Sequence, residues 1–144
     1  MRCWRLASLC PFLVLGCSGA AQYDQLEVVA TDYAFTAPDT VASGEVAVSL
    51  VNRGTVMHEV KVIALNRGVD LARVLPLAMA DSAWAEYREP TSGILTAQPG
   101  LQTPGRLLID FKPGRTYLLV CAMAQSDTSP LHSELGMVRV LAVR

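Results

Sequence analysis

The sequence has few of the residues on which nucleic-acid sites and most enzyme sites depend. Its 144 residues include two histidines, and aromatic residues make up only 6% of the chain. Its 12 basic residues nearly balance 13 acidic ones, and no Lys/Arg-rich stretch is interleaved with aromatic side chains. The positively charged surface that nucleic-acid binding requires is therefore not predicted.

Several catalytic motifs are also absent from the sequence. The segment "HEVKV" at residues 58–62 lacks the second histidine of a HExxH zinc site, and its alternation is that of a strand rather than a helix. There is no serine nucleophile-elbow motif and no glycine-rich phosphate loop. These absences argue against a zinc protease, a serine hydrolase and a nucleotide-binding enzyme, and we predict no small-molecule substrate.

No hydrophobic run is long enough to span a bilayer. Residues 1–16 carry Arg2 and Arg5 before the apolar run "LASLCPFLVLG", a pattern typical of a secretory signal peptide. The following "VLGCSG" resembles the lipobox of bacterial lipoproteins, which implies lipidation of Cys17. The alternative is an ordinary signal peptide cleaved near Ala20 or Ala21. Both predict an exported protein of the periplasm or cell envelope, with residues 17–25 as a tether and 26–144 as one domain.

Cysteine is scarce once the signal is set aside. Cys3 and Cys10 leave with the signal peptide and Cys17 would carry lipid, so Cys121 is the single thiol left in the domain. A lone thiol in an oxidising compartment is a liability unless it is buried or bound to a metal.

Period-two alternation dominates the predicted domain. It predicts strands that are separated by Gly/Pro turns, at residues 26–38, 45–52, 58–65, 106–111, 116–122 and 136–143. In the first of them Tyr33 and Phe35 would share one face. In the third, His58 would lie on the inner face and Glu59 on the outer one, as a solvent-facing residue or a salt-bridge partner. Many short alternating strands indicate an all-β sandwich or barrel of antiparallel character.

One interval departs from this pattern. Residues 69–89 have helix-forming composition, with Asp70 and Asp81 as plausible N-caps and Pro76 expected to divide or kink the run. We predict one or two short helices inserted between strands. Residues 91–105 look like a loop, with at most a short strand at Ile94.

Four metal-capable side chains fall at predicted strand ends. His58 begins a strand, Cys121 ends one, His132 lies on the next loop, and Met137 heads the final strand. Taken singly, each has an ordinary explanation as a core or surface residue. Together, two imidazoles, a thiolate and a thioether are the ligand set of a blue copper centre.

The sequence resembles the cupredoxin family in "NRG…HEV", in "KPGRTYLLVC…H…LGM" and in the final strand "VRVLAV". The resemblance implies a Greek-key β-sandwich that holds one copper ion through His58, Cys121, His132 and Met137. It also implies that Asn52, or else the backbone of Arg53–Gly54, helps to fix the ligand loops and that the ion carries one electron, Cu(I) to Cu(II). Four protein ligands would leave no open position for a substrate, so an enzyme is not predicted. The expected partners are redox proteins of a respiratory chain, near the membrane that holds the lipid anchor.

The sequence departs from the minimal family pattern at several points. Ten residues separate Cys121 from His132, a longer gap than in plastocyanins, and no aromatic stands beside the cysteine. Apolar residues around His132 form either a docking collar for a redox partner or simple loop packing: Ala122, Met123, Ala124, Pro130, Leu131 and Leu135.

Three alternatives to the electron carrier stay open. Met57 and Met123 each adjoin a ligand position, and thioethers favour Cu(I), so a periplasmic protein that delivers copper to an acceptor is the main alternative. Their simpler explanation is gap-filling in the core. A metal-free interaction sandwich is a third possibility, and zinc binding in vitro is a fourth.

Overall fold

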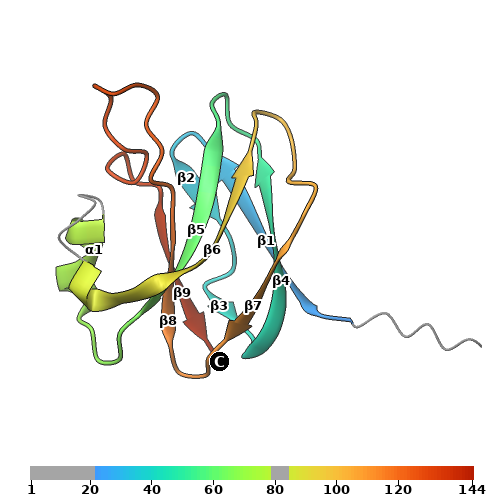
Figure 1. The fold of residues 1–144 in the computed structure, drawn as a ribbon, viewed down its shortest axis with the longest axis vertical. Coiled ribbons are helices and arrows are strands. Elements are labelled where there is room, and N and C mark those ends of the chain that lie inside the picture. The colour runs from blue at the N-terminus through green and yellow to red at the C-terminus, as the bar shows by residue number, and fades with distance from the viewer. Residues whose placement is uncertain (1–21, 79–84) are drawn as a thin grey trace, which may run out of the picture.

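The computed structural model describes residues 22–78 and 85–144, so the predicted signal peptide, Cys17 and Asp81 lie outside the described residues. Most of the described chain is strand, and Figure 1 shows the strands as two layers. They are β1 (Asp24–Thr31), β2 (Ala34–Thr36), β3 (Thr40–Val41), β4 (Gly44–Asn52), β5 (His58–Leu65), β6 (Arg88–Ala97), β7 (Leu107–Phe111), β8 (Thr116–Val120) and β9 (Val138–Val143).

The two layers are separate sheets. One has the order β2-β1-β4-β7 and the other the order β3-β9-β8-β5-β6. Most neighbours are antiparallel, but β1 pairs with β4 and β3 with β9 in parallel. The predicted all-β sandwich is confirmed, with two parallel pairs that the strand pattern did not indicate.

The core lies between the sheets because each strand alternates its side chains. On β5, Val60, Val62 and Ala64 are buried in the core while Glu59 and Lys61 are only partly buried, as the sequence predicts. Phe111 is fully buried and packs edge-on against Tyr117, with ring centroids 4.8 Å apart. This aromatic pair closes the end of the core at which β7 ends and β8 begins.

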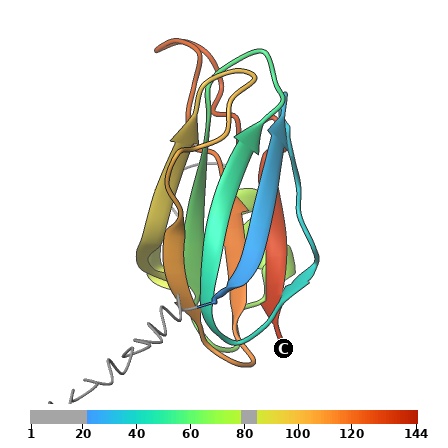
Figure 2. The same cartoon turned by 90° about the vertical axis from the view of Figure 1, so that its right-hand side faces the viewer.

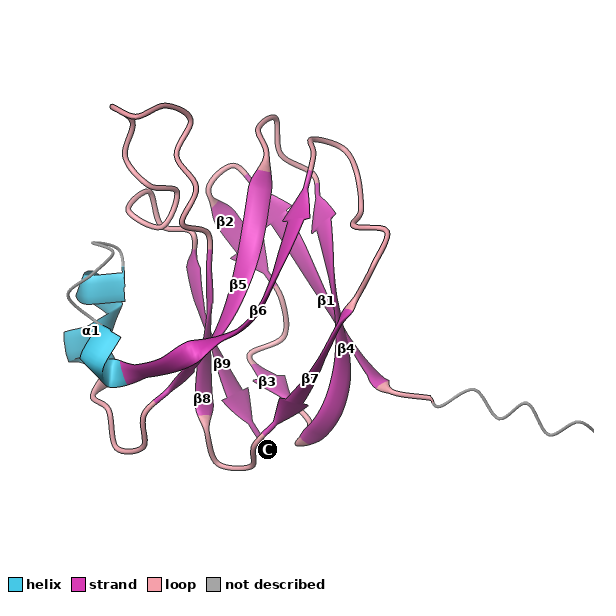
Figure 3. Ribbon diagram, in the orientation of Figure 1, coloured by secondary structure: helices cyan, strands magenta, loops and turns pink. Residues whose placement is uncertain are grey.

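The helical insert covers the outer face of the larger sheet. Helix α1 (Leu71–Ala78) contributes buried Val74 to a second apolar cluster with residues of β5 and β8 (Ile63, Leu65, Leu118, Val120), and Figure 3 shows it beside that sheet. The Asp70 carboxylate accepts the Ala72 amide at 2.9 Å, which confirms the predicted N-cap. The helix runs through Pro76 without ending there, and the 3-10 turn η1 (Ala85–Tyr87) leads into β6. None of the helices in the described ranges is both long and apolar enough to cross a membrane.

Two predictions about strands are corrected by the structure. Residues 26–38 are not one strand, because a two-residue turn at Asp32–Tyr33 joins β1 to β2, and Tyr33 has φ of 64°. The strand within residues 91–105 is longer than the short strand predicted at Ile94, because β6 continues to Ala97, while residues 98–105 lie outside the named strands. Among the described strands, β6 pairs only with β5, so it lies at the edge of its sheet and buries little of its surface. Its sequence therefore lacks a strong apolar alternation.

The sandwich places several strand ends at one pole, uppermost in Figures 1 and 2. β5 begins there at His58, opposite Ala97 at the end of β6, and β8 ends there beside the start of β9. β1 and β4 run parallel and end at the same pole, at Thr31 and Asn52. Residues far apart in the sequence therefore meet there.

Candidate metal centre

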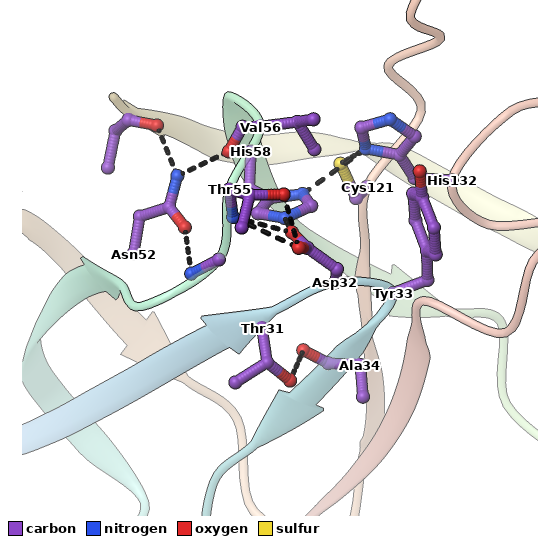
Figure 4. A network of polar contacts seen from close by, with 12 residues as sticks. Thr31, Asp32, Tyr33, Ala34, Asn52, Thr55, Val56, His58, Cys121 and His132 are labelled. Carbon is purple, nitrogen blue, oxygen red and sulfur yellow. Dashed lines mark hydrogen bonds and ion pairs between the residues drawn. The ribbon is translucent and has the colours of Figure 1, made fainter. Parts of the chain in front are cut away.

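Three of the predicted ligands converge at this pole. The candidate ligand atoms of His58, Cys121 and His132 all lie within 4.8 Å of one another, and all three side chains are buried. The two Nδ1 atoms are 3.2 Å apart, and His132 Nδ1 is 3.4 Å from Cys121 Sγ (Figure 4). Two buried imidazoles and one buried sulfur fit a soft or borderline metal ion such as copper or zinc.

The long gap between Cys121 and His132 is closed by backbone hydrogen bonds at its base. The His132 amide donates to the Met123 carbonyl at 2.7 Å, and the Ser133 amide donates to the Cys121 carbonyl at 2.8 Å. The intervening residues form the protruding loop drawn at the top of Figure 1. The extra length therefore does not separate the two ligands.

Met137 is brought to the same place by its backbone. Its amide donates to the His132 carbonyl at 2.9 Å, and its carbonyl accepts the Cys121 amide at 3.1 Å. Gly136, at φ of 108°, makes the turn into this position. Met137 is fully buried in the core cluster that also contains Cys121. It is thus linked directly to both the second histidine and the cysteine.

An aspartate outside the predicted ligand set holds His58. Asp32, in the β1–β2 turn, accepts a hydrogen bond from His58 Nε2 at 3.0 Å (Figure 4). Its carboxylate also accepts the amide of Thr55 at 2.9 Å and the hydroxyl of Thr55 at 2.7 Å. The Thr55 side chain, followed by His58, lowers the Asp32 pKa to about 2. The carboxylate is therefore ionised and acceptor-only, which assigns the proton of His58 to Nε2.

Asn52 ties together the loop that precedes His58. Its Nδ2 donates to the carbonyls of Val56 and Ala97 at 2.8 and 2.9 Å, and its Oδ1 accepts the Gly54 amide at 2.8 Å. Asn52 is fully buried, so these bonds use the donors and acceptor of its amide away from water. It lies where the sequence placed it, beside the loop of the first histidine.

Burial shifts the ionisation of two of the candidate ligands. Burial raises the pKa of the Cys121 thiol above its ordinary value, and burial together with the nearby His58 lowers the pKa of His132. Both shifts favour the uncharged forms, as expected for an apolar pocket. A metal ion entering the pocket would displace the thiol proton and meet a neutral imidazole.

Glu59 faces outward from β5 and forms hydrogen bonds with the segment that contains Cys121. It forms a salt bridge with Lys61 at 3.2 Å, one of the two roles that the sequence predicted for it. Its Oε1 also accepts the Ala122 amide at 3.1 Å, and its own amide lies 3.5 Å from Cys121 Sγ. The residue after the first histidine thus fixes the segment that carries the cysteine.

Tyr33 contacts both imidazoles from the β1–β2 turn. Its ring centroid is 5.0 Å from that of His132 and 6.3 Å from that of His58, in edge-on geometry. Its hydroxyl accepts a hydrogen bond from Gln125 on the protruding loop. Sequence reasoning placed Tyr33 in a strand and did not consider Asp32. The one available signal was "TDYA", a turn-forming aspartate inside an alternating run.

Gly54 leaves the space in which Asp32 meets His58. A Cβ at this position would lie 2.2 Å from Asp32 Oδ1 and 2.8 Å from His58 Nε2. We expect Gly54→Ala to displace the Asp32 carboxylate and to lower the free energy of unfolding by about 1.5–3 kcal/mol, the contribution of a hydrogen bond to a charged group. Urea unfolding measures it. Gly105→Ala is the matched control, because its Cβ would meet nothing within 4 Å. Equal effects in the two variants would contradict this account.

Comparisons with known proteins give the fold but no family assignment. No family model matches the sequence, and no curated protein matches it. Among solved structures, auracyanin B is similar, with 23% identity and a TM-score of 0.51 over 84% of this chain and 88% of its own. This chain has a cupredoxin fold.

Two further structures support this fold. Auracyanin A of Chloroflexus aurantiacus, described as a "blue" copper protein, is 14% identical over 85% of this chain and all of its own. Dithionite-reduced auracyanin of Roseiflexus castenholzii is 18% identical over 87% of this chain and 99% of its own. Both have TM-scores of 0.51. In this cupredoxin fold, the pole that holds His58, Cys121 and His132 is the candidate metal centre.

Proposed function

We propose that this protein is a one-electron carrier that holds one copper ion through His58, Cys121, His132 and Met137. The observation that carries the proposal is the convergence of His58 Nδ1, His132 Nδ1 and Cys121 Sγ in one buried cluster. Two imidazoles and a thiolate are the principal donors of blue copper sites, and the buried Met137 would supply the thioether of that ligand set. The cupredoxin fold, shared with auracyanin A, which is described as a "blue" copper protein, supports it.

The surrounding residues suit a site whose geometry changes little with oxidation state. Bound copper would accept and release one electron between Cu(I) and Cu(II). The chain's own contribution is to hold the donors still: Asp32 fixes His58, Asn52 fixes the loop before it, and Glu59 fixes the segment after Cys121. Because the donors are buried and a fourth ligand closes the set, no position is left for a substrate, and we propose no enzymatic activity.

A cavity beside His132 is the proposed contact site for a redox partner. It has a volume of about 430 Å³ and is lined by both polar and apolar residues, among them Met57, Pro99, Met123 and Ala124. Met123 and Ala124 belong to the apolar collar that the sequence predicts. A partner protein seated there would lie against the edge of one copper ligand, which gives a short path for the electron.

We further propose that the protein is exported and is tethered through a lipid on Cys17. The support is the signal-like segment at residues 1–16 and its lipobox-like end. A diacyl anchor is strong enough to hold a domain stably at a membrane. It would raise the effective concentration of membrane-bound respiratory partners without new contacts.

Titration with Cu(II) tests the proposed carrier. We expect the purified protein to develop an intense visible band at one equivalent of copper, to lose it on reduction and to regain it on reoxidation through repeated cycles. At free copper about 100-fold above the dissociation constant, the metal should also stabilise the fold by about 2.7 kcal/mol. A colourless complex would contradict the proposal and favour zinc-like binding. No stabilisation by copper would favour a metal-free interaction sandwich.

Copper delivery is a second candidate, favoured by the two thioethers at the cavity. Met57 and Met123 line it together with His132, and Gln98 Nε2 donates to Met57 Sδ at 3.3 Å. Thioethers prefer Cu(I), so they would suit a path on which that ion leaves the protein. A delivery protein should lose copper to a Cu(I) chelator within the reduction phase of each cycle, whereas an electron carrier should retain it. The variant Met57→Leu, Met123→Leu should slow this loss only if delivery is the function.

A further inference from the structure

The ligand His58 is held on its outer side by a fixed carboxylate. Asp32 reaches it from a different sheet, at 3.0 Å from Nε2, while His58 itself is fully buried. The amide and hydroxyl of Thr55 hold the same carboxylate, and Gly54 leaves room for it. The position of the carboxylate is therefore determined by several groups, and not by His58 alone.

The hydrogen bond decides which nitrogen of His58 faces the candidate metal centre. An ionised carboxylate can only accept, so Nε2 donates its N–H to Asp32, and in the neutral imidazole the lone pair is then on Nδ1. Nδ1 is the atom that lies 3.2 Å from His132 Nδ1, on the side of Cys121 (Figure 4). The imidazole is thus arranged for metal binding before any metal arrives.

Among the described residues, no Lys or Arg side chain forms a salt bridge with Asp32, which contacts the imidazole of His58 instead. Glu59, by contrast, is paired with Lys61. A carboxylate hydrogen-bonded to a ligating imidazole raises the basicity of that ligand. Extra negative charge near a metal stabilises its more highly charged state.

From this arrangement we propose that Asp32 is a positioning residue of the copper centre: it fixes His58 for metal binding and shifts the bound ion toward Cu(II). The inference rests on the proposed function and deepens it. It predicts a lower reduction potential than the same centre would have without the carboxylate. Asp32 is not itself a proposed copper ligand, and it acts on the centre only through its hydrogen bond with His58.

The test removes the charge while keeping an acceptor. Asp32→Asn retains an oxygen for the Nε2 proton, so we expect the visible band to persist. The affinity for Cu(II) relative to Cu(I) should fall about tenfold, at the lower end of effects of ligand-supporting residues. For one electron this corresponds to a potential about 59 mV higher. Asp110→Asn is the matched control, because it makes the same substitution away from the candidate centre. Asp110 lies on β7 opposite Glu45, near the start of β4, and pairs with Lys112.

A second readout needs no copper. In ¹⁵N spectra of the metal-free protein, His58 should be the Nε2-protonated tautomer in the wild type and in Asp110→Asn, and a mixture of tautomers in Asp32→Ala. A single Nε2-protonated form in Asp32→Ala would overturn the positioning role. A wild type that binds copper with the visible band, but whose potential is unchanged in Asp32→Asn, would overturn the charge effect and leave the proposed function standing. A wild type without the band would overturn both.

Discussion

Replacing Cys121 by serine is expected to abolish the visible band of the copper-loaded protein. The band requires a thiolate bonded to copper, and Cys121 is the free cysteine among the described residues. A serine oxygen would be a harder and more weakly held ligand at this position. The affinity for copper should also fall by at least 100-fold, because one of the three closely grouped donors is lost. Absorption spectroscopy and a competition titration with a chelator measure the two effects.

The control for this experiment is the other cysteine of the predicted mature chain. In a chain that begins at Cys17, Cys17→Ser should leave the band and the affinity unchanged, because Cys17 is not one of the proposed ligands. Unfolding in urea should show that Cys121→Ser is still folded without metal. A band of full intensity in folded Cys121→Ser would refute the proposed copper ligation.

The largest loss of stability is expected for Phe111→Ala. Phe111 is fully buried and packs against Tyr117 at the end of the core opposite the candidate metal centre. Its removal leaves a cavity between the sheets, which costs about 3–5 kcal/mol in the free energy of unfolding for a buried phenylalanine. The position pairs with Gly44 at the start of β4, about 25 Å along that strand from Asn52. Urea unfolding measures the loss.

The control for Phe111 lies on the same strand. Leu108 is 48% exposed, so Leu108→Ala should change the free energy of unfolding by less than about 1 kcal/mol. If Phe111→Ala and Leu108→Ala remain folded, the copper band of each should have the wild-type shape, because the proposed ligands lie at the pole opposite Phe111. A change in the band of Phe111→Ala would show that the core end and the metal centre are coupled.

Much of the candidate centre could be predicted because its candidate ligands are residue types that occur only a few times in the chain. Only two histidines are present, and the order His58, Cys121, His132, Met137 at strand ends already indicates a blue copper ligand set. The positions of Glu59 and Asn52 could be predicted for a similar reason, and the role of Asn52 in holding the ligand loops stays a prediction. Strand alternation gives the side of the sheet for Glu59, and the loop position gives the neighbourhood of Asn52.

The sequence by itself determined the burial pattern of the strands and the types and order of the candidate ligands, because alternation and residue identity are local features of the chain. Only the tertiary structure decided that Asp32 and Tyr33 contact the histidines and that β6 extends the larger sheet. An exposed turn residue and a thinly buried edge strand carry no periodic signal. Asp32 lies in a turn of the smaller sheet and His58 begins a strand of the larger one, and their contact exists because the packing of the sheets brings the turn beside the histidine.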